Sequence, residues 1–352
     1  MYKINDKISG LTPYNPLSDR YKIRLDANES CFNLSKEILQ EIHKALDNVD
    51  FNRYPDPNCT KLSKAFADYY KIDSKLVTVG NGSDELIGVI LNSFLTKGQS
   101  IVTIEPDFSM YRFYATLNEL TCITVAKDKN LKIDVQEVIN AVKENKAGAV
   151  IFSNPCNPTS LGLGEKEIIK LIEDVDALVI LDEAYMDFWD KSLLSKVEDY
   201  DNLIILRTAS KSCGAAAVRL GFAVSNTKIS YILKAVKSPY NVNTISQVIG
   251  EIIYKNHIFL DDNKKTIVSL RISLYNDIKN IESKYKDKMY VLESDANFIF
   301  IKTKYAKDIY DFMVTKSVAI RLMGEYIRVS AGTEEENKIF IECLNDFCEN
   351  NF

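Results

Sequence analysis

The chain has 352 residues, of which 46% are hydrophobic and 26% are charged, and its formal net charge is −5. This length gives a prior of about two domains and is sufficient to bury a large core. No cluster of Lys and Arg indicates a nucleic-acid surface, no run of about 18 apolar residues indicates a membrane span, and the first ten residues lack the apolar stretch of a signal peptide. The sequence therefore predicts a cytoplasmic protein that binds neither nucleic acid nor membrane.

Cysteine and histidine usage narrows the chemistry further. The seven cysteines are an odd number without a CxxC pair, which predicts reduced thiols and no zinc site. There are two histidines, His43 and His257, and His43 falls off the apolar face of a helix expected over residues 35–46. We therefore expect no metal, and a proton carrier other than histidine if the chain is an enzyme.

The first two thirds of the chain alternate short apolar runs with helical patterns. Five apolar runs are bounded by polar or turn residues and predict strands, at residues 76–80, 100–104, 149–153, 177–181 and 203–206. Helices are expected over residues 84–95 and 111–120, among the segments that separate these runs. This alternation predicts an α/β fold with a mostly parallel sheet flanked by helices.

Beyond residue 243 the pattern changes to long helical stretches, followed by three further strand candidates at residues 289–292, 298–301 and 326–329. This part predicts a smaller α+β domain, and we expect the N-terminal segment to pack with it. The expected division is an N-terminal arm that includes part of the small domain, a large domain and a C-terminal small domain, at residues 1–46, 47–250 and 251–352.

Polar clusters follow several predicted strands, and ligands bind at this edge of an open α/β sheet. The turn NGSDE at residues 81–85 leads into a helix, and its backbone N–H groups suit a phosphate, although such a turn is also an ordinary connection. It matches neither the dinucleotide fingerprint nor the P-loop. The sequence SNPCNPT at residues 153–159 follows another strand, and its two Asn-Pro steps form a shaped loop that presents Asn157.

Two more clusters contain candidate catalytic groups. LDEAY at residues 181–185 places a carboxylate directly after an apolar run, where burial without a partner is costly. By itself this acid could equally be a helix cap or an exposed loop residue. RTASKS at residues 207–212 is followed by Arg219. A lone lysine is usually a surface residue, but Lys211 lies among hydroxyls and small residues where a strand has just ended.

The ordered set NPxNPT, DEAY and SK with an arginine eight residues later resembles the fold-type-I pyridoxal-phosphate aminotransferases. More narrowly, the chain is similar to the histidinol-phosphate aminotransferases. Further matches occur in the family's order, as LTPY at 11–14, LDANE at 25–29, RYPD at 53–56, GSDE at 82–85, EPDFSMY at 105–111, NF at 297–298 and YIRVSAGT at 326–333. The resemblance implies a large domain with a mixed, mostly parallel sheet, a smaller α+β domain, pyridoxal 5'-phosphate as cofactor, and transamination in histidine biosynthesis.

The resemblance also implies a role for each matched residue. Lys211 would carry the cofactor as a Schiff base and move the substrate proton, and Asp182 would keep the pyridine nitrogen protonated. Tyr185 and Asn157 would hydrogen-bond the phenolic oxygen of the ring. The remaining cofactor contacts would come from Phe108 on the ring and from the phosphate ligands Ser83, Asp84, Thr208, Ser210, Arg219 and, across the interface of a homodimer, Tyr54. The substrate would be bound by Arg328, Arg321, Tyr14, Asn28 and Asn157.

Departures from the family pattern leave the substrate open. Ser160 stands where the family has glycine, the stretch after the lysine reads CGAAA, and Phe108 replaces the usual tyrosine. One alternative is an aromatic or broad-specificity aminotransferase. Another is a threonine-phosphate decarboxylase of corrinoid synthesis, whose usual N-terminal histidine-glycine motif is missing here. A non-catalytic binding protein on the same fold would have lost the lysine, and Lys211 is present.

Overall fold

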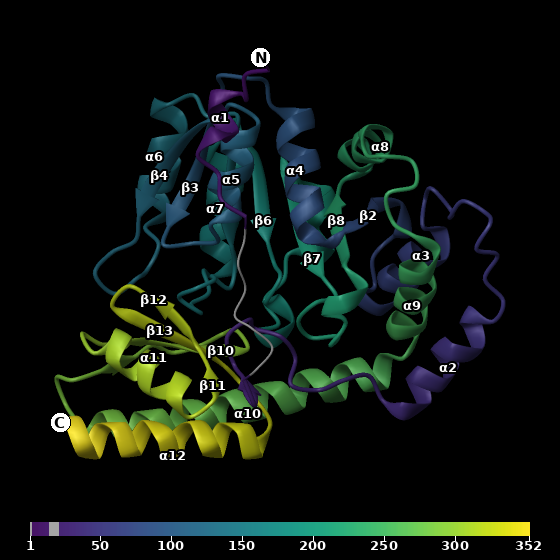
Figure 1. Ribbon diagram of the computed structural model, residues 1–352. Coiled ribbons are helices and arrows are strands. Elements are labelled where there is room, and N and C mark those ends of the chain that lie inside the picture. The colour runs from purple at the N-terminus through teal and green to yellow at the C-terminus, as the bar shows by residue number, and fades with distance from the viewer. Residues whose placement is uncertain (1, 14–20) are drawn as a thin grey trace.

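A computed structural model describes residues 2–13 and 21–352. Its largest element is a seven-stranded sheet in the order β2-β8-β7-β6-β5-β3-β4 (Figure 1). The strands are β2 (Val77–Asn81), β3 (Ser100–Glu105), β4 (Thr121–Ala126), β5 (Ala149–Ser153), β6 (Leu178–Asp182), β7 (Leu203–Thr208) and β8 (Leu220–Ser225). Strand β8 runs antiparallel to β2 and β7, and the other pairs are parallel. The prediction of a mixed, mostly parallel sheet is confirmed.

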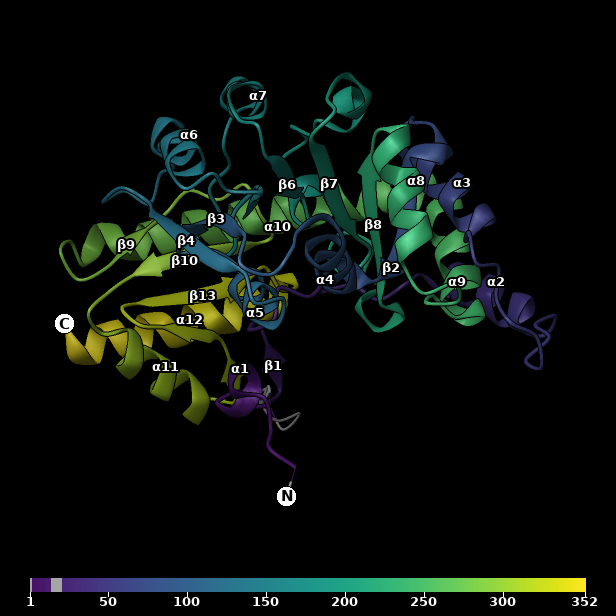
Figure 2. The ribbon, with the colours of Figure 1, turned by 90° about the horizontal axis from the view of Figure 1, so that it is seen from above.

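The two faces of this sheet bury alternate residues of the same strands, as the period of two requires. Ile151 and Ile180 pack on one face, whereas Val150 and Val179 pack on the other. The first face is covered by α4 (Gly82–Phe94), α5 (Met110–Leu117) and α8 (Thr227–Val236). The second is covered by α3 (Thr60–Tyr70), α6 (Val135–Glu144) and α7 (Glu165–Asp174). Figure 2 shows α6 and α7 on the side opposite α4 and α5.

A second core lies below the large sheet in Figure 1, around a small antiparallel sheet in the order β12-β13-β10-β9. Its strands are β9 (Tyr290–Val291), β10 (Phe298–Lys302), β12 (Arg321–Met323) and β13 (Tyr326–Ser330). Helices α11 (Ala306–Thr315) and α12 (Glu334–Asn351) pack on this sheet. Near the N-terminus, β1 (Ile23–Arg24) pairs in parallel with β11 (Val318–Ala319).

Helix α10 (His257–Lys284) joins the two cores. Its Leu260 packs in the core of the large sheet, and its Leu274 packs in the core of the small sheet. Between them, Ile267 lies in a cluster with Tyr185 and Phe298. At about 1.5 Å per residue, the helix is about 42 Å long. Because one helix takes part in all three clusters, it fixes the small sheet relative to the large one.

The N-terminal segment divides its contacts between both cores. Strand β1 pairs with β11, which lies next to the small sheet, whereas α2 (Lys36–Leu46) packs on α9 (Thr244–Lys255). The physical reason is that the apolar stripe of α2, with Ile38 and Ile42, meets Ile252 of α9. The boundary predicted at residue 250 falls inside α9. The domain limits therefore stay predictions.

Three further properties bear on function. Within the described residues, no helix combines the length and the apolar character that a membrane crossing needs. All seven cysteines are free in the structure. In the same part of the chain, no group of three or more His, Cys, Asp or Glu side chains is arranged to hold a metal ion.

Candidate active site

The predicted polar clusters lie together along one edge of the large sheet. Ser153 at the end of β5 is opposite Asp182 at the end of β6. Thr208 at the end of β7 is opposite Gly221 of the antiparallel strand β8. Asn81 at the end of β2 is opposite Leu220, the first residue of β8. The sheet register therefore brings residues 81–85, 153–159, 182–185 and 207–212 to the same edge.

Asp182 is a buried carboxylate, 3% exposed, at the end of β6. One oxygen accepts a hydrogen bond from the Tyr111 hydroxyl at 2.8 Å, and the other accepts from the Ala184 N–H at 3.1 Å. These neutral donors are its partners among the described residues, and burial raises the pKa of Asp182 to about 7. Such a carboxyl group is suited to a cationic ligand, because a positive charge nearby would favour its ionised form.

Tyr185 and Asn157 are both oriented as hydrogen-bond donors. The Tyr185 hydroxyl accepts from Asn28 Nδ2 at 3.0 Å, so its own proton remains available for donation. Asn157 Oδ1 accepts from Arg328 Nη1. Because a guanidinium can only donate, the amide oxygen must face it, and the Asn157 NH₂ group faces away. The pair therefore suits an acceptor such as a phenolate oxygen.

Lys211 lies beside this pair. Its Nζ donates to the Ala27 carbonyl at 3.3 Å and stands 5.7 Å from the centre of the Tyr185 ring. The neighbouring Asn28 has a left-handed backbone with φ of 53° and is held by Ser330, whose hydroxyl oxygen accepts from the Asn28 N–H at 2.9 Å. The lysine amine, the tyrosine hydroxyl and Asn28 thus form one connected group.

Small residues shape an anion cradle at the start of α4. A Cβ on Gly221 would lie 2.3 Å from the Ser83 nitrogen, so the helix terminus can lie against β8 only because that residue is glycine. Arg219 has a left-handed φ of 54°, and its Nη2 lies 3.5 Å from Asp84 Oδ2. At the end of β7, which neighbours β8, Thr208 Oγ1 donates to Ser210 Oγ at 3.0 Å. Helix N–H groups, hydroxyls and a guanidinium are the donors that phosphate prefers.

The remaining predicted residues have different surroundings. Phe108 is half-buried and packs edge-to-face on Tyr111, with ring centres 5.6 Å apart. Arg321 of β12 is directly opposite Arg328 of β13. Tyr54 is 80% exposed and its ring stacks on Tyr240 at 4.6 Å. Tyr14 lies outside the described residues.

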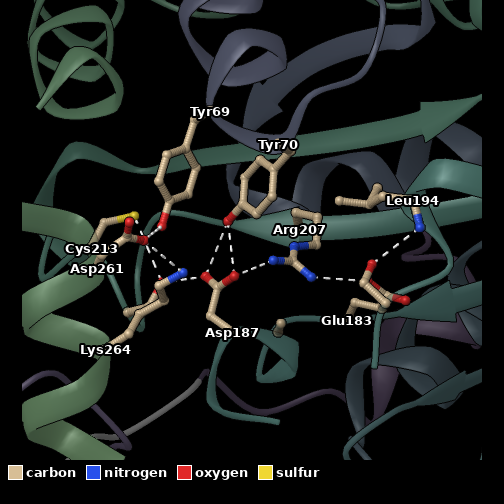
Figure 3. Close-up of polar contacts among 12 residues, drawn as sticks. Tyr69, Tyr70, Glu183, Asp187, Leu194, Arg207, Cys213, Asp261 and Lys264 are labelled. Atoms are coloured by element: carbon tan, nitrogen blue, oxygen red, sulfur yellow. Dashed lines mark hydrogen bonds and ion pairs between the residues drawn. The ribbon is translucent and has the colours of Figure 1, made fainter. Parts of the chain in front are cut away.

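Two features of this edge were not predicted from the sequence. The first is Tyr111, the hydrogen-bond donor to Asp182, which closes the matched EPDFSMY segment but was given no role. The second is a buried ionic cluster beneath the edge, where Arg207 lies between Glu183 and Asp187 (Figure 3). Its signal was an arginine and two acids beside the predicted cofactor residues, but sequence cannot show that they meet.

Comparison with known proteins identifies the family. A model of the class I and II aminotransferases matches residues 20–344. A histidinol-phosphate aminotransferase of Clostridium novyi is 42% identical, over 96% of this chain and 95% of its own length. Another, from Clostridium kluyveri, is 34% identical over 95% of both chains. The chain belongs to the histidinol-phosphate aminotransferase family.

The fold agrees with that membership. The crystal structure of a histidinol-phosphate aminotransferase from Sinorhizobium meliloti in complex with pyridoxal-5'-phosphate has a TM-score of 0.88 to this chain. It is 22% identical and covers 99% of this chain and 98% of its own. The chain has the fold-type-I architecture and is a pyridoxal-phosphate-dependent aminotransferase.

The residues at the sheet edge fit pyridoxal phosphate. Buried Asp182, met by neutral donors, suits a protonated ring nitrogen. The outward donors of Tyr185 and Asn157 suit the phenolic oxygen. The glycine-shaped terminus of α4 suits the phosphate.

Proposed function

We propose that this chain transfers an amino group between L-histidinol phosphate and 2-oxoglutarate, with imidazole acetol phosphate and glutamate on the other side of the reaction, as a step of histidine biosynthesis. The observation that carries the proposal is the cross-strand pair of Arg321 and Arg328. Directly opposite residues of antiparallel strands project from the same face of a sheet. Arg328 also donates a hydrogen bond to Asn157 at the predicted cofactor site, and this contact supports a role of the pair near the reacting group.

Two arginines suit the two substrates. Glutamate presents an α-carboxylate, whereas histidinol phosphate has a phosphate ester on the adjacent carbon instead. A planar guanidinium can bind either anion through two parallel hydrogen bonds, so Arg328 can serve both half-reactions. The phosphate carries more charge and needs more donors, which Arg321 would supply. Tyr14 and Asn28 are proposed to complete this site.

The chemistry divides among the residues of the sheet edge. When bound, pyridoxal phosphate supplies an electron sink for the charge left on the substrate when its proton departs. Lys211 would hold the cofactor and then move that proton, since its amine lies beside Tyr185. Asp182 holds a proton on the ring nitrogen, and Tyr185 and Asn157 donate to the ring oxygen.

The other predicted residues hold the cofactor in place. Phe108 would cover one face of the ring. The phosphate is bound by the N–H groups of Ser83 and Asp84 at the start of α4, by the hydroxyls of Thr208 and Ser210, and by Arg219. Removing the cofactor should therefore leave Asp182 and this anion cradle unsatisfied together, and inorganic phosphate should compete with the cofactor in the cradle.

We also propose that the chain works as a cytoplasmic homodimer, in which Tyr54 of the partner subunit contacts the cofactor phosphate. Tyr54 is 80% exposed and stacks on Tyr240, which is 47% exposed, and Phe51, three residues before Tyr54, is 75% exposed, so this segment presents aromatic side chains to solvent. Aromatic residues are enriched in interfaces. Sedimentation should give a dimer, and a fully active monomer would contradict this arrangement.

The substrate assignment is tested by single-turnover kinetics with histidinol phosphate, histidinol and phenylalanine. We expect loss of the phosphate to cost far more than a change of ring. Arg321→Ala should raise the activation free energy of the reaction with histidinol phosphate by roughly 2–5 kcal/mol. The reaction with glutamate should be nearly unaffected, because only the phosphate needs the second arginine. Arg328→Lys should slow both, since a point charge replaces a planar fork.

Two outcomes would redirect the assignment. If phenylalanine or histidinol reacts as well as histidinol phosphate, a broad-specificity aminotransferase takes its place. If the protein releases carbon dioxide from threonine phosphate, the decarboxylase alternative does. Borohydride reduction followed by peptide mapping checks the catalytic lysine, and cofactor attached to a residue other than Lys211 would overturn its role.

A further inference from the structure

The residue that follows Lys211 is held from two sides. The Ser212 hydroxyl donates to Asp187 Oδ2, and the Ser212 carbonyl accepts from Asn263 Nδ2 of α10 at 2.6 Å. Ser212 is 2% exposed. Both the side chain and the backbone of this residue are therefore fixed by parts of the chain far from it in sequence.

Asp187 is itself fixed by two further groups. The Tyr70 hydroxyl donates to both of its carboxylate oxygens, at 3.0 and 3.1 Å, and Arg207 pairs with it through Nη2. The Arg207 guanidinium also lies over the Tyr70 ring, 4.6 Å from its centre. In Figure 3 the carboxylate of Asp187 points to both Tyr70 and Arg207. A carboxylate with this many partners has little freedom to move, so it is a rigid acceptor for Ser212.

The cluster continues to a second carboxylate at its other end. Arg207 Nη1 pairs with Glu183 Oε2 at 2.9 Å. Glu183 also accepts from the Ser192 hydroxyl at 2.5 Å and from the Leu193 N–H at 3.2 Å. Ser192 and Ser212 thus each donate one hydroxyl hydrogen bond to a carboxylate of the same cluster, at opposite ends.

Three members of the cluster, Glu183, Arg207 and Ser212, each adjoin a residue of the cofactor site along the chain. Glu183 follows Asp182, and Arg207 precedes Thr208. Ser212 follows Lys211. The cluster therefore ties together three segments that would meet the ring nitrogen, the phosphate and the reacting carbon of the cofactor.

We propose that Ser212, held by Asp187, is a positioning residue that sets where the Lys211 amine stands relative to the rest of the site. A lysine side chain has four rotatable bonds, and the hydrogen bond of its Nζ to the Ala27 carbonyl is long, at 3.3 Å. The amine can be placed accurately only if the backbone at its base is fixed, and small misplacements of reacting groups slow chemistry strongly. This inference rests on the proposed role of Lys211.

The test compares Ser212→Ala with the matched control Ser192→Ala. Each variant removes one hydroxyl that donates to a carboxylate of the cluster, so both should lower stability towards denaturant. Cofactor-free protein is mixed with pyridoxal phosphate, and the absorbance change of covalent attachment is followed by stopped flow. We expect about a tenfold slower attachment step in Ser212→Ala, as for the loss of one hydrogen bond to a charged group, and an unchanged step in Ser192→Ala.

Steady-state kinetics provide a second readout. In Ser212→Ala, kcat should fall while KM for glutamate stays the same, and the isotope effect with α-deuterated glutamate should increase because proton transfer becomes slower. Equal behaviour of the two variants in attachment and isotope effect would overturn the inference. The proposed function fails separately, if borohydride does not fix the cofactor to Lys211 in the unmodified protein.

Discussion

Asp182 and Arg207 are both buried ionisable residues at the ends of adjacent strands, yet the groups that surround them differ in charge. Arg207, 3% exposed, lies between the carboxylates of Glu183 and Asp187. Asp182 is equally buried but meets only the neutral donors Tyr111 and Ala184 among the described residues. The described residues balance the first charge, and we propose that a cationic group of the cofactor balances the second.

The difference separates a structural role from a binding role. Burial raises the pKa of Asp182 to about 7, so the cofactor-free protein holds a carboxyl group that ionises near neutral pH. Strongly shifted groups of this kind concentrate at functional sites. The balanced Arg207 cluster instead joins segments of the fold. Substitutions of Asp182 and of Arg207 should therefore change the unfolding free energy of the cofactor-free protein in opposite directions.

The largest effect on stability is expected for Arg207→Met. This change leaves the buried carboxylates of Glu183 and Asp187 without their cation, which costs about 3–5 kcal/mol of unfolding free energy. Arg112→Met is the control, because its ion pair with Glu105 is exposed and should contribute below about 1 kcal/mol. Urea unfolding of the cofactor-free proteins measures both, and equal losses would show that the Arg207 cluster does not stabilise the fold.

Asp182→Asn should act in the opposite direction on stability. The folded-state pKa of about 7 lies above the ordinary value of 3.8. The contribution of protonated Asp182 to the unfolding free energy is therefore fully present below about pH 4. It is lost as the pH rises through 7, which lowers the unfolding free energy by up to about 4 kcal/mol. The cofactor-free variant lacks this loss and should be the more stable protein at neutral pH. With cofactor bound, kcat should fall by about 10²–10³, as for other buried electrostatic contacts.

Thermal unfolding across the pH range checks the first part of this prediction. As the pH rises from 4 to 7, the melting temperature of the cofactor-free wild type should fall increasingly below that of Asp182→Asn. A constant difference over that range would mean that Asp182 titrates at its ordinary value and is not a buried, unbalanced acid.

A smaller effect is expected for Tyr111→Phe, which removes the 2.8 Å hydrogen bond to Asp182. The loss should weaken pyridoxal phosphate binding by about 1.5–3 kcal/mol, because the ionised carboxylate needs this donor once the cofactor is present. Tyr69→Phe removes a comparable bond to Asp261 outside the site and should leave cofactor affinity unchanged. Equilibrium titration of the two cofactor-free variants distinguishes them.

The central strands could be predicted from the sequence because they follow local rules, whereas the roles of the site residues came from the family resemblance and stay predictions. Strands β5, β6 and β7 are buried on both faces and appear as continuous apolar runs, with polar residues directly after them. Strand β4 was missed because it is an edge strand whose residues are mostly half-buried, which weakens its apolar signal. Strand β8 was also missed.

Contacts between distant segments could not be predicted in the same way. Tyr111 and Asp182 are 71 residues apart, and Ser212 and Asn263 are 51 apart. Arg207 appeared in the sequence as one charged residue at a strand end, and its two carboxylate partners are decided by how β6 and β7 pack. Pattern and resemblance name the residue types, but only the packing shows which charge is balanced.

The most direct test of this difference is the ionisation state of Asp182 with and without cofactor. Infrared difference spectra between wild type and Asp182→Asn isolate this carboxyl group, at about one pH unit below its raised pKa of about 7. We predict a protonated carboxylic acid band in the cofactor-free protein that is replaced by a carboxylate band when pyridoxal phosphate binds. A carboxylate band in both states would contradict the assignment of Asp182 as the unbalanced acid that the cofactor completes.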